Sequence, residues 1–242
     1  MTVGVVIPVL SAIDLTKRFG DVTAVSELSF DVQAGAVTGF LGPNGAGKTT
    51  TLRLLLGLAA PSSGRGLVFG QDYAKLVRPA SRVGAVLEAA DVHPGRTGRD
   101  HLRVLSAAAG VPSRRVAEVL ALVDLERSAN RRAGGYSLGM RQRLALAAAL
   151  LGEPELLILD EPSNGLDPEG IRWLRDFLVN FAAEGRTVLL SSHHLSEIAG
   201  TVDRVVIIDR GRLVAHCGLN DLTADGSSLE SAFLALTGGA RR

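Results

Sequence analysis

The sequence lacks several features that would place the protein outside the cell or across a membrane. Its 242 residues include one cysteine, Cys217, which excludes an internal disulfide framework and favours a reducing compartment. No apolar run reaches the ~20 residues of a membrane-spanning helix, and the longest candidate, residues 144–152, is followed by Glu153 and Pro154. The start, MTVGVVIPVL, has no basic segment typical of a signal peptide. We therefore expect that any work at a membrane needs a second chain to span it.

An excess of charge of one sign is also missing. Lys and Arg number 26 against 25 Asp and Glu, so the net charge of +1 gives no general reason to expect nucleic acid or an anionic membrane as a partner. Internal repeats and low-complexity linkers are absent as well. Apolar residues make up 46%, which is enough for a sizeable core, and the length suits one large domain with a subdomain.

The order of the predicted elements indicates the fold class. Strands are predicted at 12–19, 25–32, 36–41, 67–69, 82–87, 156–159, 187–191, 204–209 and 212–217. Helices are predicted at 48–58, through most of 98–151 with breaks at 110–112 and 134–135, and at 171–183, 195–200 and 229–236. The run LLIL (156–159) is apolar throughout, as expected of a strand buried in a parallel sheet. Alternation of strands and helices around a helical insert predicts an α/β core with a mostly parallel sheet.

A glycine-rich segment, GPNGAGKT at 42–49, matches the pattern G-x-x-x-x-G-K-[ST] between a predicted strand and a predicted helix. Glycines let successive backbone N–H groups point at phosphate oxygens, and the helix N-terminus adds its dipole. Lys48 would reach the β- and γ-phosphates, and the Thr49 hydroxyl would bind Mg²⁺. The alternative is a glycine-rich turn that matches by chance. The predicted nucleotide contacts are Gly42, Pro43, Asn44, Gly45, Ala46, Gly47, Lys48, Thr49 and Thr50.

Two carboxylates follow the buried strand in LLILDEP, at the end of the strand where parallel sheets build their sites. Asp160 is suited to hold Mg²⁺ through water, and Glu161 is placed to accept a proton from an attacking water. A solvated pair at a strand end is the simpler alternative. Phosphoryl transfer depends mainly on positioning and charge stabilisation, so a carboxylate base, a metal, a lysine and a cradle of N–H groups are sufficient.

A second anion site is predicted at SLGMRQR (137–143), where a Ser and a Gly precede a basic helical run. The simpler alternative is a helix start with Ser137 as its N-cap. The segments GPNGAGKTT, SLGMRQRLALAAAL, LLILDEPSNGLD and LLSSHHLSE occur in the order and rough spacing of ABC transporter ATPase subunits. The chain resembles this family from IDLTKRFG at 13–20 to LESAFLALTGG at 229–239, through the Walker A, signature, Walker B with D-loop, and switch-histidine motifs.

The resemblance implies that two ATPase subunits pair head to tail, as a homodimer or a heterodimer, with Mg-ATP between the Walker A loop of one and the signature of the other. Ser137, the Gly139 N–H and the following helix would face the partner's γ-phosphate. His193 would hydrogen-bond the γ-phosphate, although His194 lies next to it and a capping role is the alternative. Asp167 resembles the D-loop Asp that joins the two sites, or is a turn residue before Pro168. Phe19 would stack on adenine, or lie in the core.

The sequence departs from the commonest family pattern in two places. The signature reads YSLGM at 136–140 where LSGGQ is usual, so Leu138 replaces the first Gly and Met140 replaces Gln. Glu88 stands where most relatives have the Q-loop Gln; it would coordinate Mg²⁺, or is a solvated loop residue. VGAVLE, HPGRTGRDHL and YSLGM together resemble the exporters of antibiotics and peptides, of the bacitracin, lantibiotic and daunorubicin type.

The prediction is one ABC-type ATPase domain over 1–242. A P-loop NTPase core and an antiparallel β subdomain would occupy about 1–87 and 153–242, with an inserted helical subdomain at about 88–152. ATP hydrolysis would power transport, as export of a drug, antibiotic or peptide, by a separate transmembrane permease subunit, with this chain peripheral on the cytoplasmic face. No nucleic acid is expected. The alternatives are a soluble ABC ATPase acting on ribosomes or DNA, and a non-hydrolysing subunit, against which Lys48, Asp160, Glu161 and His193 argue. The cargo is not predicted.

Overall fold

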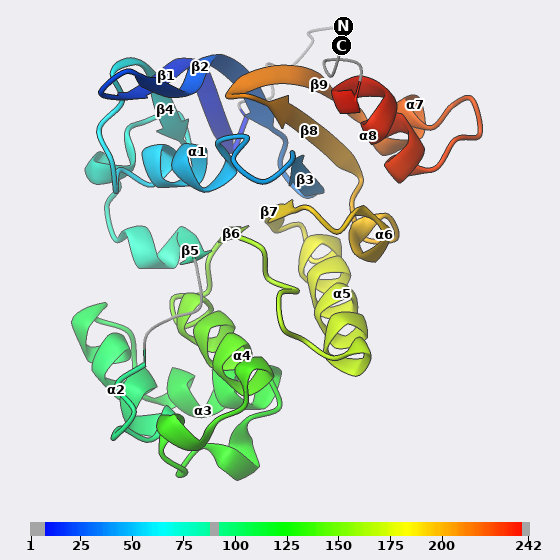
Figure 1. The fold of residues 1–242 in the computed structure, drawn as a ribbon. Coiled ribbons are helices and arrows are strands. Elements are labelled where there is room, and N and C mark those ends of the chain that lie inside the picture. The colour runs from blue at the N-terminus through cyan, green and yellow to red at the C-terminus, as the bar shows by residue number, and fades with distance from the viewer. Residues whose placement is uncertain (1–7, 88–91, 239–242) are drawn as a thin grey trace, which may run out of the picture. The chain divides into compact units, whose positions relative to one another are not determined.

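The computed structural model describes residues 8–87 and 92–238 (Figure 1). The chain divides into two units. The first is formed by the residues up to Leu76 together with those from Arg175 onward, and the second is Val77–Leu174. Helix α5 (Pro168–Ala183) passes through the boundary between Leu174 and Arg175.

The first unit contains an antiparallel sheet in the order β2-β1-β4. Its strands are β1 (Leu10–Phe19), β2 (Val22–Val32) and β4 (Ser63–Val68). Leu10 is paired with Val32 on one side and Val68 on the other, and all three are buried. The ring of Phe30 on β2 stacks on that of Phe40 at a centroid distance of 5.3 Å, which joins this sheet to strand β3 (Val37–Leu41).

Strand β3 lies in the parallel part of the first unit, between β7 (Thr187–Ser192) and β8 (Arg204–Asp209), and β9 (Arg212–Gly218) adds to β8 antiparallel. Every residue of β3 and β7 is buried, as expected of strands covered on both faces. Leu41 is paired with both Ser192 and Ile207. The loops that follow β3 and β7 therefore begin side by side at the carboxyl edge, where parallel sheets place their ligands.

Helix α1 (Lys48–Leu55) follows β3 and packs on β4. Three further helices of the first unit lie toward the C-terminus: α6 (Leu195–Ile198), α7 (Leu219–Leu222) and α8 (Leu229–Gly238). Helix α8 contacts α6, α7 and β9, and buries Leu229 and Phe233.

The second unit contains a parallel strand pair and three helices that pack on one another. The strands are β5 (Val83–Val86) and β6 (Leu156–Leu159); the helices are α2 (Gly98–Ala108), α3 (Arg114–Leu122) and α4 (Leu138–Ala149). Leu102, Leu120 and Leu144 are fully buried between the helices, and each contributes about 1.5–3 kcal/mol by its removal from water. Among the described residues, no helix is both long enough and apolar enough to span a bilayer.

The predicted α/β class is confirmed, with a mostly parallel sheet, an antiparallel sheet and helices. Strand β4 begins four residues before the predicted Leu67, because SGRG pairs with β1 although it carries no apolar residue. The first helix ends at Leu55 rather than at the predicted Leu58, and α7 was not predicted. The helical segment predicted at 88–152 falls within the second unit, and its bounds as a subdomain stay a prediction.

Candidate functional site

The loop from Gly42 to Gly47 connects β3 to α1 in a tight fold. Gly45 and Gly47 have φ angles of 80° and 102°, which L side chains rarely adopt. The Ala46 N–H donates to the Pro43 carbonyl at 3.1 Å, and the Lys48 ammonium donates to the Gly42 carbonyl at 2.8 Å. Helix α1 begins directly after this loop, so the positive end of the helix dipole lies at the loop. This arrangement is suited to hold phosphate.

Close packing explains why the loop contains glycines. A Cβ on Gly42 would lie 2.5 Å from the Ile208 carbonyl oxygen, and a Cβ on Gly47 would lie 2.5 Å from the Ala24 carbonyl oxygen. The same Ala24 oxygen is 2.7 Å from the Cβ position of Gly211, whose N–H donates to the Ala46 carbonyl at 2.9 Å. The phosphate loop therefore packs directly against strand β2 and the β8–β9 turn.

The two histidines after β7 differ in their surroundings. Because Leu41 pairs with Ser192, Gly42 and His193 are the next residues on neighbouring strands at one edge of the sheet. His193 is half-buried there. His194 is exposed at the N-cap of α6, and its N–H donates to the Ser192 hydroxyl at 2.9 Å. His194 thus has a structural role in the turn before α6, while His193 lies beside the start of the phosphate loop.

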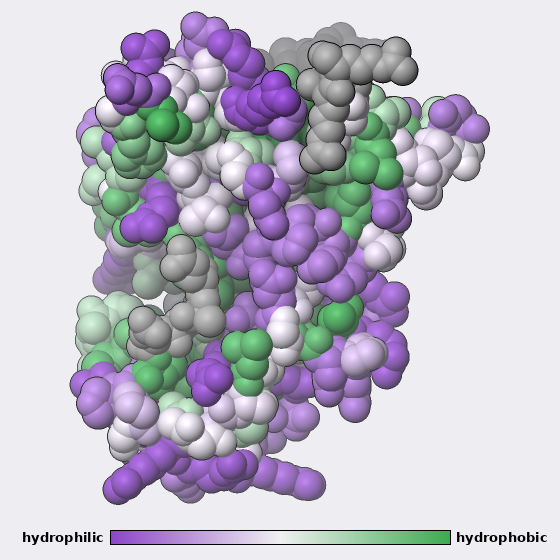
Figure 2. All heavy atoms as spheres, in the orientation of Figure 1, coloured by the Kyte–Doolittle hydropathy of each residue, from purple (hydrophilic) through white to green (hydrophobic). Residues whose placement is uncertain are grey.

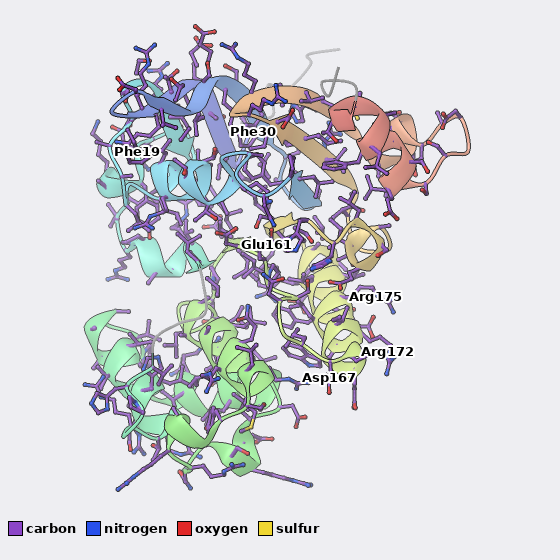
Figure 3. The ribbon with its side chains drawn as sticks, in the orientation of Figure 1. Phe19, Phe30, Glu161, Asp167, Arg172 and Arg175 are labelled. Atoms are coloured by element: carbon purple, nitrogen blue, oxygen red, sulfur yellow. The ribbon has the colours of Figure 1, made fainter. Side chains whose placement is uncertain are left out.

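Phe19 lies at the end of β1 and is 55% exposed (Figure 3). The Lys17 ammonium lies 4.9 Å from the centroid of its ring. The alternative that Phe19 belongs to the core is therefore excluded, and the ring is available for stacking with a flat partner.

In the second unit, the carboxylates follow β6 directly. All four residues of β6 are buried, Asp160 is 5% exposed, and its N–H donates to the Val86 carbonyl at 2.8 Å. Glu161 is half-buried just beyond β6 (Figure 3) and has a φ of 49°, in the left-handed region that costs a non-glycine residue about 1–3 kcal/mol. The turn that redirects the chain here closes with a bond from the Asn164 N–H to the Glu161 carbonyl at 3.1 Å.

Ser137 is the N-cap of α4, and its hydroxyl accepts a hydrogen bond from the Met140 N–H at 3.2 Å. The capping geometry considered from the sequence is present, and it leaves the serine O–H free to donate to an anion. Tyr136 fixes the approach to the cap: it is buried, its hydroxyl donates to the Ser128 carbonyl at 2.7 Å, and Arg141 donates to its carbonyl at 2.9 Å. Burial raises the pKa of the Tyr136 phenol above its usual value of 10.0.

Asp167 precedes Pro168 at the start of α5 (Figure 3), and its carboxylate accepts from the Gly170 N–H at 2.8 Å. The predicted turn role is therefore realised as a helix cap. A hollow of about 420 Å³ lies between this loop and the start of α4. Its lining includes Ser137, Leu138, Gly139, Leu166 and Asp167.

The structure contains two side-chain contacts that the sequence did not predict, and it does not describe one of the predicted site residues. The Arg143 guanidinium lies 4.2 Å from the ring centroid of Trp173, which joins α4 to α5. Leu138 contacts Gly165, a pairing that no spacing pattern indicates. Glu88, predicted as a magnesium ligand, lies outside the described residues.

A glycine-rich loop before a helix, and carboxylates after a buried parallel strand, define a P-loop ATPase. The chain matches the ABC transporter family over residues 25–164. It is 43% identical to the bacitracin transport ATP-binding protein BcrA of Bacillus licheniformis over 88% of this chain and 71% of that protein. It is 35% identical to the lantibiotic transport ATP-binding protein SrtF of Streptococcus pyogenes over 83% of this chain and 87% of that protein. A solved ATP-binding subunit of an ABC transporter superposes with a TM-score of 0.84 at 30% identity, over 94% of this chain and 99% of that one.

The chain belongs to the ABC transporter family, as one of its ATP-binding, ATP-hydrolysing subunits. The resemblance to subunits of the bacitracin and lantibiotic type, predicted from the motifs, is confirmed by these relatives.

Proposed function

We propose that this subunit drives the export of a peptide-like or antibiotic compound through a separate membrane-spanning chain. The observation that carries the proposal is the combination, in one chain, of the phosphate loop at 42–47 with a capped, exposed helix start at Ser137. Export is supported by relatives whose names describe bacitracin and lantibiotic transport. The membrane chain would select the cargo.

The phosphates of ATP would bind residues 42–50, with Lys48 at the β- and γ-phosphates. The position of Lys48 supports this role. The residue is only 6% exposed, and a hydrogen bond of 2.8 Å to the Gly42 carbonyl holds its ammonium inside the loop. Phe19 would stack on the adenine, which fits its exposed ring. A stacked base contributes about 1–3 kcal/mol to binding.

Mg²⁺ would be held by Thr49 and Asp160, with Glu88 as a further ligand. Hydroxyl and carboxylate oxygens are the donors that this hard cation prefers, and it commonly takes few protein ligands together with substrate phosphates. The half-buried Thr49 at the start of α1 and the buried Asp160 after β6 fit this donor set. The ion would neutralise charge on the phosphates.

Glu161 would accept the proton of the attacking water, and His193 would donate a hydrogen bond to the γ-phosphate. The half-buried carboxylate at the end of β6 supports the first role, and the place of His193 beside Gly42 supports the second. A positioned general base raises the rate of the chemical step by about 10²–10⁴-fold.

The signature would act on a second ATPase subunit, identical or different. Ser137 and Gly139 would contact the partner's γ-phosphate, and Asp167 would join the two sites. The exposed N-cap of α4 and the exposed Asp167 fit contacts made by another subunit. Two such half-sites per chain give two complete sites in a two-fold pair.

The subunit would be peripheral at the cytoplasmic face, with the helical segment at about 88–152 receiving a helix of the permease. Figure 2 shows hydrophilic residues over much of the face in view, with apolar residues in smaller groups. Val104 on α2 and Leu122 on α3 are large apolar side chains left about half exposed, as a docking surface requires. Action on ribosomes or DNA without a membrane partner is the alternative, which the net charge of +1 does not favour.

The catalytic part of the proposal is tested by ATP hydrolysis and by dimer formation. We expect Glu161→Gln to lower kcat by about 10²–10³ while ATP binding persists, so that Mg-ATP converts this variant to a dimer in size-exclusion chromatography with light scattering. Glu230→Gln, in the first turn of α8, removes an exposed carboxylate of the same type and should behave as wild type. Full activity in Glu161→Gln would contradict the assigned base.

The transport part is tested by affinity purification of tagged Glu161→Gln from gently solubilised native membranes with ATP present. We expect a stoichiometric multi-spanning membrane protein to copurify, and to be lost without nucleotide binding in Lys48→Ala. Recovery of ribosomes or DNA with no membrane protein would leave the ATPase standing and overturn the transporter assignment.

A further inference from the structure

Leu138 is the first residue of α4, directly after the Ser137 cap, and its side chain is directed at a glycine of another loop. Gly165 has a φ of 75°, and a Cβ at that position would lie 1.9 Å from Leu138 Cδ2 and 2.8 Å from its Cγ. The end of the leucine side chain therefore occupies the space over the Gly165 backbone. Leu138 nevertheless remains 42% exposed, which is unusual for a residue whose sole purpose is core packing.

The contact is reciprocal. Leu166, the next residue of the same loop, places its Cδ2 3.4 Å from the Cβ position of Gly139, next to Leu138 on α4. Each segment thus supplies one leucine and one glycine, and each leucine lies against the glycine of the other segment. Only the approach at Gly165 needs glycine, because a Cβ there would overlap Leu138, whereas a Cβ on Gly139 would make an ordinary van der Waals contact with Leu166.

The hydrogen bonds that shape the loop at 163–167 are local. The Leu166 N–H donates to the Ser163 carbonyl at 3.1 Å, and Asp167 caps its own helix through Gly170. Leu138 of α4 contacts the loop, and Leu166 of the loop contacts α4, through apolar side-chain atoms. The reciprocal leucine–glycine contact therefore links the loop to the start of α4 without a hydrogen bond between these two described segments.

We propose that Leu138 is a positioning residue that holds the loop at 163–167 against the start of α4, so that Ser137 and Asp167 are presented to the second ATPase subunit as one rigid edge. The proposal rests on the proposed function, in which these two residues act across a dimer. The commoner signature has glycine at this position and no side chain to make the contact. Leu138, which is itself the departure from that pattern, would thus add a contact that the commoner signature lacks.

The kinetic test compares Leu138→Gly with Leu138→Met in the full chain. Since Lys48 and its loop bind ATP within each subunit, we expect Leu138→Gly to leave the Kd of the monomer for ATP and the KM within about twofold, while kcat falls by about tenfold. Leu138→Met keeps an apolar side chain of similar volume and should restore kcat to within about twofold of wild type.

The structural test is amide hydrogen exchange of the nucleotide-free protein. We expect residues 163–170 to exchange about tenfold faster in Leu138→Gly and at the wild-type rate in Leu138→Met. Gly165→Ala displaces the leucine and should reproduce the lowered kcat. Gly110→Ala is its matched control, because Gly110 has a similar φ of 65° but open space around its Cβ position.

Unchanged exchange at 163–170 in Leu138→Gly would overturn the proposal, and so would faster exchange with wild-type kcat. Equal effects of Gly165→Ala and Gly110→Ala would trace the loss to backbone strain and also overturn it. Failure of the proposed function has a different signature: the wild-type chain would neither hydrolyse ATP nor dimerise, whereas the exchange comparison would be unaffected.

Discussion

At the scale of single residues, the neighbours His193 and His194 provide an internal comparison. His193 lies beside Gly42 at the sheet edge, whereas His194 is exposed and held by the Ser192 turn. We expect His193→Ala to lower kcat by about 10²-fold, since a donor to the transferred phosphate is lost, and His194→Ala to stay within about twofold of wild type. Steady-state ATP hydrolysis measures both. The reverse order would assign the switch role to His194.

Phe19 offers a second test on one side chain. Its ring is exposed at the end of β1, so replacement should disturb little of the fold. We expect Phe19→Leu to weaken ATP binding by about tenfold through loss of stacking, and Phe19→Tyr to bind within about twofold of wild type. Titration with a fluorescent ATP analogue gives the affinities. Equal binding by the leucine and tyrosine variants would exclude the stacking role.

At the scale of elements, Arg115 fastens α3 to the end of α4. It is buried and donates to the carbonyls of Leu150 and Leu151 at 3.1 and 3.2 Å, groups that the helix itself leaves unsatisfied. It also pairs with Glu118 on its own helix. The guanidinium therefore acts as a side-chain cap for the C-terminal end of the signature helix.

Replacement of Arg115 should be costly, and its neighbour supplies the control. We expect Arg115→Met to lower the free energy of unfolding by about 2–4 kcal/mol, because the Leu151 carbonyl loses its donor. The Leu150 carbonyl and the Glu118 carboxylate each lose one of two partners. Arg114 has a side chain that is 78% exposed, so Arg114→Met should cost less than about 0.5 kcal/mol. Urea denaturation of the two variants gives the difference, and equal values would show that the cap contributes nothing.

Sequence patterns predicted those elements whose burial is uniform or periodic, such as β6 and the helices of the second unit. Strand β4 begins before its predicted start, because four of its six residues are glycine or polar and their strand conformation comes from pairing with β1. In the site, the order of motifs predicted the phosphate loop and the strand-end carboxylates. The contact of Leu138 with Gly165 joins residues far apart in the sequence through shape alone, so no local pattern could have indicated it.

At the scale of the whole molecule, each unit contains a histidine whose pKa is lowered in the folded protein. Burial, and then the nearby Arg96, lower the pKa of His101 below its usual 6.5. Burial, and then Arg204, do the same for His216. A depressed pKa means that the unfolded chain binds more protons near pH 6. The folded state therefore keeps its full stability above pH 6.5, the pKa of histidine in the unfolded chain. It loses stability as the pH falls from there through the lower pKa values that the two histidines have in the folded protein.

We accordingly expect the Tm to fall on acidification between about pH 7 and pH 5. The double variant His101→Asn with His216→Asn should show a smaller fall, since its side chains do not titrate in that range. Thermal unfolding at a series of pH values measures the slopes. Equal slopes in the wild type and the double variant would mean that other groups cause the acid sensitivity.

The carbonyl of Ala24 has a consequence for how the protein tolerates mutation. One peptide oxygen fills the space beside both Gly47 and Gly211, although Gly211 lies in the β8–β9 turn and outside every nucleotide motif. In a survey of all single substitutions, Gly211 should therefore be as intolerant as the glycines of the phosphate loop. A reader of that survey alone would assign Gly211 to the active site, whereas its constraint comes from the back wall that the two positions share.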